Sequence, residues 1–291
     1  MKTLLGMFFQ KTKKYEYRTP YHIAFKFMKK YWLVVKNTFQ ETLVYRLNFI
    51  MWRVRTVLQL LTMYFLWLAV LPKGQVIAGY NQSLMLTYIL GTSLLSSIVI
   101  SSRIQSIGDE INRGDLSNYL LKPFNYFFYW FSKDIGDKAM NIMFSVVELS
   151  ILFYLLKPPF FVQKDLSFLG LSLLAAIFGL FLYFFFNFLI GLLGFWSPDV
   201  WAPRFIFTII LSFFAGGIFP LDILPKQIFS FLQFLPFPYL LYFPLKIYLG
   251  KISMQETYFG FLMLFIWIFL LYLIVKFAWE RGLKIYTAEG R

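Results

Sequence analysis

The block that decides the fold reads LSFLGLSLLAAIFGLFLYFFFNFLIGLLGFW, residues 166–196, and it contains no charged side chain. A helix needs about 20 mostly apolar residues to cross roughly 30 Å of hydrocarbon, so this block can span a bilayer and also tilt or project beyond it. Of the 291 residues, 59% are hydrophobic and 14% are charged, whereas a soluble domain carries about 25% charged residues. A soluble fold would leave a large apolar surface in water. The sequence therefore predicts an all-α integral membrane protein.

Five other apolar blocks are also predicted to cross the membrane, which gives six transmembrane helices. The six spans lie near residues 56–71, 84–102, 139–156, 166–196, 205–219 and 258–277. The first span has room to begin several residues earlier, with Arg53 and Arg55 reaching back to the cytoplasmic interface. The glycines of the fourth span indicate close helix packing rather than a ligand loop; they are Gly170, Gly179, Gly191 and Gly194.

The segment after the fifth span, residues 218–249, is apolar enough for a seventh crossing but is rich in proline. Each proline removes an N–H and clashes with the preceding turn, so we expect two short half-helices, 226–235 and 238–249, instead of one long helix. They would form an extracellular re-entrant hairpin, which membrane depth tolerates only where protein or a water-filled cavity covers it. The residues that mark this hairpin are Pro220, Asp222, Pro225, Pro236 and Pro244.

The distribution of lysine and arginine decides between six and seven spans. With six spans, the inside segments hold all but six of the 28 Lys and Arg residues. A seventh crossing would put the basic C-terminal segment outside and weaken this bias. The prediction is six spans with both termini in the cytoplasm, in a single transmembrane domain over residues 23–291 that follows a basic extension over residues 1–22.

Two cytoplasmic segments are predicted to be more than plain loops. Residues 23–49 have the pattern of a basic, aromatic-bearing amphipathic helix that lies in the headgroup region; a helix packed on its own protein, with its charges in solvent, fits equally well. Residues 103–138 hold five acidic and five basic residues and have a helix–turn–helix outline. Asp115 can cap a short helix over 116–121 that stops before Pro123. We expect this loop to dock a cytoplasmic protein, with a solvated hairpin that has no partner as the alternative.

Several function classes find no support in the sequence. The net charge of +14 comes from basic residues clustered between apolar blocks and at the N-terminus, as topology signals are, so nucleic acid is not an expected partner. The chain has no cysteine and only one histidine, His22, which excludes disulfides, thiolate sites and multi-histidine metal sites. It lacks the phosphate-binding loop GxxxxGK followed by Ser or Thr, and also HExxH and GxSxG. We predict no catalytic residues, no metal site and no nucleotide site of its own.

Glu148, halfway through the third span, is the clearest intramembrane ionisable residue. An acid at that depth is a candidate functional residue by default. Either it forms a structural hydrogen bond or faces a cavity as a protonated carboxyl, or it serves a proton relay or contacts a cationic substrate. Because the sequence shows no second buried charge as a partner for Glu148, it gives little support for a proton-coupled transporter. Asn141 and Asn187 are expected to be packing contacts.

The order of these parts resembles the ABC-2 type permeases. The loop sequence IGDEINRGDL at 107–116, followed by LLKP at 120–123, is similar to the loop of that family that meets the ATPase. The proline-rich segment at 217–225 and the ending WERGLKIY at 279–286 also resemble the family. The residues that this resemblance assigns to ATPase coupling are Ile107, Asp109, Glu110, Arg113, Gly114, Leu120, Leu121 and Pro123.

The resemblance implies a permease subunit of an ATP-driven exporter, located in a bacterial-type cytoplasmic (inner) membrane. Two permeases, identical or different, would pair, and each would dock a separate ATPase that binds ATP and Mg, so that this chain needs no cofactor. An apolar and aromatic path between the two copies, built from spans one, two and five, favours a lipid, a hydrophobic drug-like molecule or a lipid-linked glycan. The competing hypotheses are a secondary transporter driven by an ion gradient, a non-transporting membrane scaffold and, weakest, a membrane enzyme.

Overall fold

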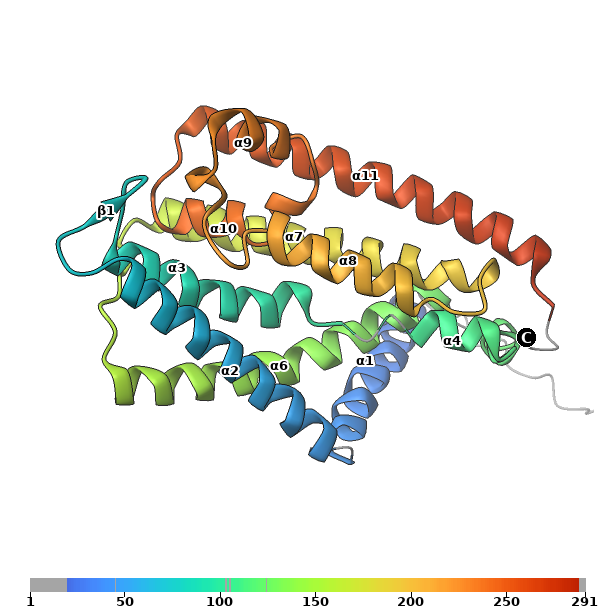
Figure 1. The fold of residues 1–291 in the computed structure, drawn as a ribbon. Helices are drawn as coiled ribbons and strands as arrows, with labels where there is room; N and C mark the ends of the chain where they lie inside the picture. The colour runs from blue at the N-terminus through green and yellow to red at the C-terminus, as the bar shows by residue number, and fades with distance from the viewer. Residues whose placement is uncertain (1–19, 45, 103, 105, 124, 288–291) are drawn as a thin grey trace, which may run out of the picture.

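The computed structural model describes residues 20–44, 46–102, 104, 106–123 and 125–287. Within these residues, five helices are long and apolar enough to cross a membrane, and they form the bundle seen in Figure 1. They are α2 (Arg46–Val70), α3 (Gln82–Leu95) with its π-helical continuation η1 (Ser96–Ile100), α6 (Tyr126–Leu156), α7 (Leu166–Leu192) with the 3-10 turn η2 (Leu193–Phe195), and α11 (Met254–Ile285). The all-helical prediction is thereby confirmed. The predicted extension over 1–22 lies outside the described residues, apart from the first turn of α1.

The first and third spans begin well before the predicted positions. α2 starts at Arg46 and α6 at Tyr126, where the sequence pointed to residues 56 and 139. Both helices begin with turns that carry charged residues and so do not belong to an apolar block. Some of these charges are buried, namely Arg53 in α2 and Asp134, Asp137 and Lys138 in α6. The amphipathic pattern of 23–49 likewise covers two helices, because α1 (Pro20–Val44) ends before α2 begins.

The fifth predicted span, 205–219, corresponds to α8 (Trp201–Phe214), an apolar helix that is shorter than the other five. A helix of this length covers about 21 Å. It ends before Gly216, whose φ of +80° suits glycine and breaks the helix.

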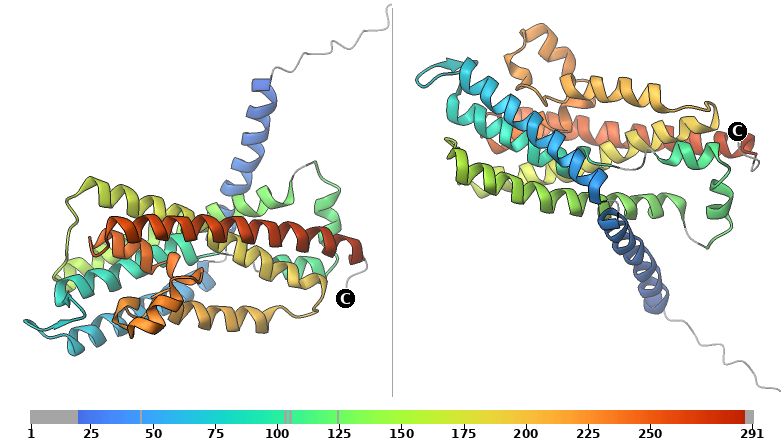
Figure 2. Two further views of the ribbon diagram at one scale, coloured as in Figure 1. Left: turned by 90° about the horizontal axis from the view of Figure 1, so that it is seen from above. Right: turned by 60° about the horizontal axis from the view of Figure 1, so that its bottom comes forward.

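The long helices run in a common direction, and the two ends of the bundle differ (Figure 1). The hairpin of β1 (Val76–Ile77) and β2 (Tyr80–Asn81) lies at one end. The last turn of α11 and α4 (Ser106–Asn112) lie at the other. Helix α1 runs steeply across the long helices, as Figure 2 shows, and it packs on α6. A Cβ atom on Gly136 of α6 would lie 2.8 Å from the carbonyl oxygen of Val35.

The proline-rich segment consists of short helical pieces, as predicted. They are η3 (Leu221–Ile223), α9 (Lys226–Leu232), η4 (Phe237–Tyr239) and α10 (Tyr242–Tyr248). Pro220, Pro225 and Pro236 each stand immediately before one of these pieces, where the missing N–H costs least. Pro244 lies in the first turn of α10, which packs against α7.

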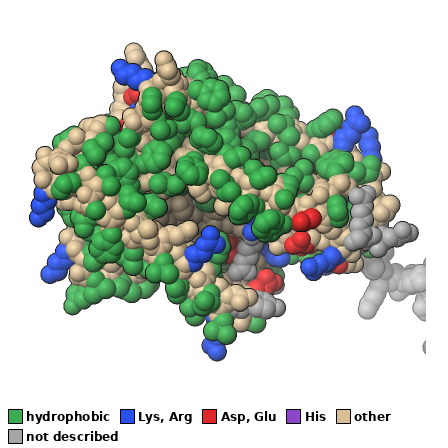
Figure 3. Space-filling model, viewed as in Figure 1, with side chains coloured by type: hydrophobic (Ala, Val, Ile, Leu, Met, Phe, Trp, Pro, Cys, Tyr) green, Lys and Arg blue, Asp and Glu red, His purple; other side chains and the backbone are tan. Residues whose placement is uncertain are grey.

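Large apolar side chains are exposed over much of the bundle, above all on α2, α6 and α11. Figure 3 shows hydrophobic side chains covering most of one face. Soluble monomers rarely expose apolar patches larger than a few hundred Å². The exposed apolar surface and the five long helices identify a multi-pass membrane protein.

Three of the four glycines in the fourth span allow a close approach, as predicted, but Gly170 does not. A Cβ on Gly191 would lie 2.7 Å from Ile107 Cβ, and one on Gly194 would lie 2.8 Å from Gly108 Cα. At Gly179 the nearest atom would be the Tyr239 carbonyl oxygen, at 3.2 Å. Around Gly170, the described residues place no atom within 4 Å apart from the nearby backbone of α7 itself.

Gly191→Ala should lower the thermal unfolding temperature in detergent by several degrees, because overpacking costs about 1–3 kcal/mol. Gly170→Ala, on the same helix, is the matched control, and it should leave the temperature unchanged or raise it since alanine favours a helix by about 0.5–1 kcal/mol. Tryptophan fluorescence would follow unfolding. Equal unfolding temperatures for the two variants would contradict the close contact at Gly191.

Candidate functional site

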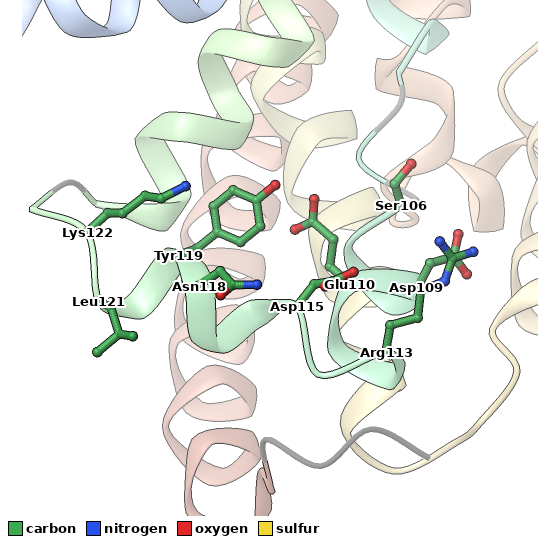
Figure 4. A pocket seen from close by; sticks show the side chains of 9 residues that line it. All are labelled: Ser106, Asp109, Glu110, Arg113, Asp115, Asn118, Tyr119, Leu121 and Lys122. Carbon is green, nitrogen blue, oxygen red and sulfur yellow. The ribbon is translucent and has the colours of Figure 1, made fainter.

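The loop between α3 and α6 forms a charged, open concavity at the α4 end of the bundle. It is built from α4, a tight turn and α5 (Leu116–Leu120), and encloses about 780 Å³. Figure 4 shows the side chains that line it: Ser106, Asp109, Glu110, Arg113, Asp115, Asn118, Tyr119, Leu121 and Lys122. The predicted helix–turn–helix is present in the structure.

Tyr286, which directly follows α11, stabilises the turn between α4 and α5. Gly114 occupies the turn with φ of +78°, a conformation that favours glycine. The Tyr286 hydroxyl donates to the Gly114 carbonyl oxygen at 2.7 Å and accepts from the Ser117 backbone N–H at 3.1 Å. Asp115 occupies the N-cap position of α5, as predicted, but its side chain forms no capping hydrogen bond to the described residues there. Sequence reasoning missed Tyr286 as a partner of this loop.

Helix α4 is seated tightly on the end of α7. Ile107 is fully buried against Gly191, and Gly108 lies against Gly194. Asn112 Nδ2 donates to the Pro198 carbonyl oxygen at 2.9 Å. Ile107 therefore anchors α4 to the bundle and does not face outward.

Glu110 also faces the protein. The Tyr126 hydroxyl donates to Glu110 Oε2 at 2.7 Å, which joins α4 to the first turn of α6. Burial raises the pKa of the Glu110 carboxyl, although the Tyr126 hydrogen bond and the nearby Lys133 charge pull it down. A carboxyl held in this way positions the loop and is poorly placed to contact a partner directly.

Five of the eight predicted coupling residues are exposed on the loop: Asp109, Arg113, Leu120, Leu121 and Pro123. Leu121 is 87% exposed and lies at the edge of the concavity in Figure 4.

Helix α1 holds the far end of the loop. Lys30 Nζ donates to the Pro123 carbonyl oxygen at 2.9 Å, and the Tyr31 hydroxyl accepts from the Asn125 backbone N–H at 3.0 Å. The exposed side chains thus project from a loop that is tied down on α1, α6, α7 and the segment after α11.

Glu148 has a charged partner, so the expectation that it stands alone is wrong. Arg53 Nε donates to Glu148 Oε1 at 2.7 Å, and Arg53 Nη2 bonds the other carboxylate oxygen. The side chains of Arg53 and Glu148 are 6% and 18% exposed. Arg53 therefore turns into the bundle instead of reaching back to the interface. Asn141 accepts a further bond from Arg53 at 3.4 Å, whereas Asn187 bonds the carbonyl oxygen of Tyr183 within α7, at 3.0 Å.

At the other end of the bundle, three side chains tie the proline-rich segment to its neighbours. Tyr80 of β2 donates to Asp222 Oδ2 at 3.1 Å. Tyr88 of α3 donates to the Gly216 carbonyl oxygen at 2.6 Å, and Trp67 of α2 donates to that of Ile218 at 3.0 Å. Of the predicted hairpin residues, Pro220, Pro236 and Pro244 are buried and Pro225 is exposed.

A sequence model of one family, described as ABC-2 family transporter protein, matches residues 57–290. The match runs from the middle of α2 through the α4–α5 loop and the proline-rich segment to α11. Helix α1 and Arg53 lie before it. A search of curated proteins finds no match for this chain.

Single cysteines placed on the loop should label according to these positions, since the native chain has no cysteine. Leu121→Cys should react with a polar maleimide at least about tenfold faster than Leu116→Cys, whose position on α5 is fully buried. The measurement is the labelling rate of purified protein in detergent. Similar rates at the two positions would contradict the described loop.

Proposed function

This chain belongs to the ABC-2 family of transporter proteins, and from that premise we propose that it is the permease subunit of an ATP-driven exporter. Two permease copies pair in the membrane, as a homodimer or a heterodimer, and each docks a separate cytoplasmic ATPase. ATP and Mg bind to that ATPase and not to this chain. The membrane is a bacterial-type cytoplasmic (inner) membrane.

The observation that carries this proposal is the exposed apolar tip of an otherwise anchored loop. Leu121 is 87% exposed at the end of a concavity rich in charges of both signs. An exposed apolar residue rimmed by charged groups suits a protein partner, which buries the leucine and pairs with the charges. This surface is supported from within by Glu110, Ile107 and Gly114. The residues that contact the ATPase are the exposed ones, Asp109, Arg113, Leu120, Leu121 and Pro123.

The proposed topology has six spans, with α8 as the fifth. Helix α8 covers about 21 Å, less than the hydrocarbon thickness, and the bilayer accommodates it by thinning or by tilt of its neighbours. The docking loop and the last turn of α11 share one end of the bundle (Figure 1), which supports placing the C-terminus in the cytoplasm with the loop. The proline-rich hairpin and the β-hairpin then lie outside, and α1 lies at the cytoplasmic headgroup region.

The translocation path runs between the two permeases and is lined by α2, α3 and α8. An open groove of about 400 Å³ follows one face of α2. It is lined by Met51, Val54, Arg55, Leu58, Gln59, Thr62 and Met63. This mainly apolar lining, with few polar groups, favours a lipid, a hydrophobic drug-like molecule or a lipid-linked glycan over a small inorganic ion.

Coupling follows from the way α4 is held. Closure of the two ATPases on ATP pushes on the exposed loop. Because α4 has almost no free space against Gly191 and Gly194, it cannot slide independently, and the push passes into α7. The permease tilts and opens the path between the copies.

Purification of the tagged protein from cells that also produce its ATPase tests this function. An ATPase with a phosphate-binding loop should co-purify with the wild type, and Leu121→Asp should reduce its yield at least about tenfold, because a charge replaces a buried apolar contact. The matched control is Leu166→Asp. Leu166 is 82% exposed on α7, and this variant should retain the ATPase.

Equal retention by Leu121→Asp and the control would count against the docking surface. Transport that persists without any ATPase would favour an ion-gradient-driven transporter, and ATPase binding without substrate flux in vesicles would favour a scaffold.

The topology predicts opposite labelling at the two ends of the bundle. In intact cells an impermeant maleimide should label Val76→Cys, on exposed β1, and should label Leu121→Cys only after the membrane is permeabilised. Labelling of both positions in intact cells would contradict the proposed orientation.

A further inference from the structure

One face of α6 carries a line of polar and charged side chains through the bundle. The members on α6 are Asp134, Asp137, Lys138, Asn141, Ser145 and Glu148; with Arg53 of α2 and Ser97 of η1, they are called the α6 ladder here. Their spacing, mostly three or four residues, keeps them on one side of the helix, over about 21 Å of its length. All are buried except the partly exposed Glu148.

At the Asp134 end of the ladder, Lys138 bonds the last residues of η1, where the helical path of α3 stops. Helix α3 loosens into η1, and the chain becomes extended at Ser101, with ψ of 127°. The last carbonyl groups of a helix have no partner within it. Lys138 Nζ donates to the carbonyl oxygens of Val99, at 3.1 Å, and of Ser101. Lys138 also lies 3.4 Å from Asp134 Oδ2. Helix α4 begins only a few residues later, so a displaced loop pulls first on the segment that Lys138 holds.

At the Glu148 end of the ladder, Arg53 joins α2 to α6 and η1. Besides its bonds to Glu148, Arg53 donates to Ser145 Oγ at 2.9 Å and to Ser97 Oγ at 3.5 Å. Ser97 and Ser145 are themselves hydrogen-bonded. One guanidinium therefore connects three helical segments.

Asn141 joins the two ends. Its amide nitrogen donates to the carbonyl oxygen of Asp137 at 2.9 Å and to Asp137 Oδ2 at 3.3 Å, while its amide oxygen accepts from Arg53. Asp137 is the covalent neighbour of Lys138. With the covalent step from Lys138 to Asp137, these contacts connect the end of η1, along α6, to Arg53 in the first half of α2.

Static stability is a poor explanation for so many buried charges. Replacing a buried ion pair by apolar residues of similar volume is often neutral or stabilising, and a membrane interior makes isolated charges more costly still. A ladder with discrete hydrogen bonds does something that an apolar contact does not: it fixes the register between segments, so that they move together.

We propose that the α6 ladder transmits movement of the docking loop to α2, with Lys138, Asn141 and Arg53 as positioning residues. This rests on the proposed function, in which an ATPase moves that loop. When the ATPases close, η1 moves with α4, Lys138 carries the shift to α6, and Arg53 turns α2, whose outer face lines the proposed path. The ladder complements the apolar seat of α4 on α7, which moves the other half of the bundle.

The test uses the permease–ATPase complex in lipid nanodiscs with Leu58→Cys, a position 59% exposed on α2, as the reporter. The probe is the maleimide labelling rate with Mg-ATP and orthovanadate compared with ADP. In the otherwise unchanged complex, the nucleotide should alter the rate about fivefold or more. With Arg53→Met and Glu148→Met together, the change should disappear, while ATP hydrolysis persists and the unfolding temperature stays near that of the unaltered chain.

Asn141→Leu is the second variant, because it removes the contacts of Asn141 with Asp137 and Arg53 and leaves both ion pairs in place. It should reduce the nucleotide effect at Leu58→Cys without abolishing it, since Arg53 keeps its bonds to Glu148 and Ser145 of α6. A nucleotide effect that is undiminished in both variants would overturn the proposal, and so would the absence of any effect before the ladder is altered. Failure of the ATPase to protect Leu121→Cys from labelling would instead contradict the proposed function, because the ATPase would then not bind the loop whose movement the ladder is proposed to transmit.

Discussion

A charge buried in a bilayer must find its counter-charge inside the protein, because hydrocarbon offers none. The pair of Arg53 and Glu148 meets this constraint, and it sets the register between two helices in the first half of the chain. It fixes α2 against α6, while Gly136 lets α1 pack closely on another part of α6. Helix α6 thus organises α1, α2 and η1, and most of the polar groups on its buried face bond to these elements or within α6.

The second half of the chain is organised by close packing instead of charge. α7 contacts α11 and α10, and glycines at its end allow α4 to sit against it. The docking loop is therefore attached twice: through Ile107 and Gly108 to the apolar half of the bundle, and through the end of η1 to the charged half. In the function proposed above, this double attachment lets a push on one exposed loop reach both halves of the bundle.

The sequence was sufficient for features that depend on local composition. Long apolar blocks predicted the five long helices, though not where α2 and α6 begin. Prolines predicted the short helices after α8, and Gly114 and Asp115 predicted the turn between α4 and α5. The sequence did not reveal contacts that join distant parts of the chain. Arg53 and Glu148 are 95 residues apart, so nothing local reveals their pairing, and buried charges on α6 disguised its first turns as loop. The seven-residue spacing of Asp134, Asn141 and Glu148, which places them on one side of a helix, was the one available signal. The inward turn of Glu110 toward Tyr126 was also beyond a local reading.

The most direct measurement of the central claim is a double-mutant cycle on Arg53 and Glu148, with Ala at each position singly and together, followed by the free energy of unfolding in mixed micelles. The account predicts that each single change costs about 3–5 kcal/mol, since it leaves one buried charge unpaired. The double change should cost less than the sum by at least about 1–2 kcal/mol. Additive costs would contradict the claim that this pair holds α2 against α6.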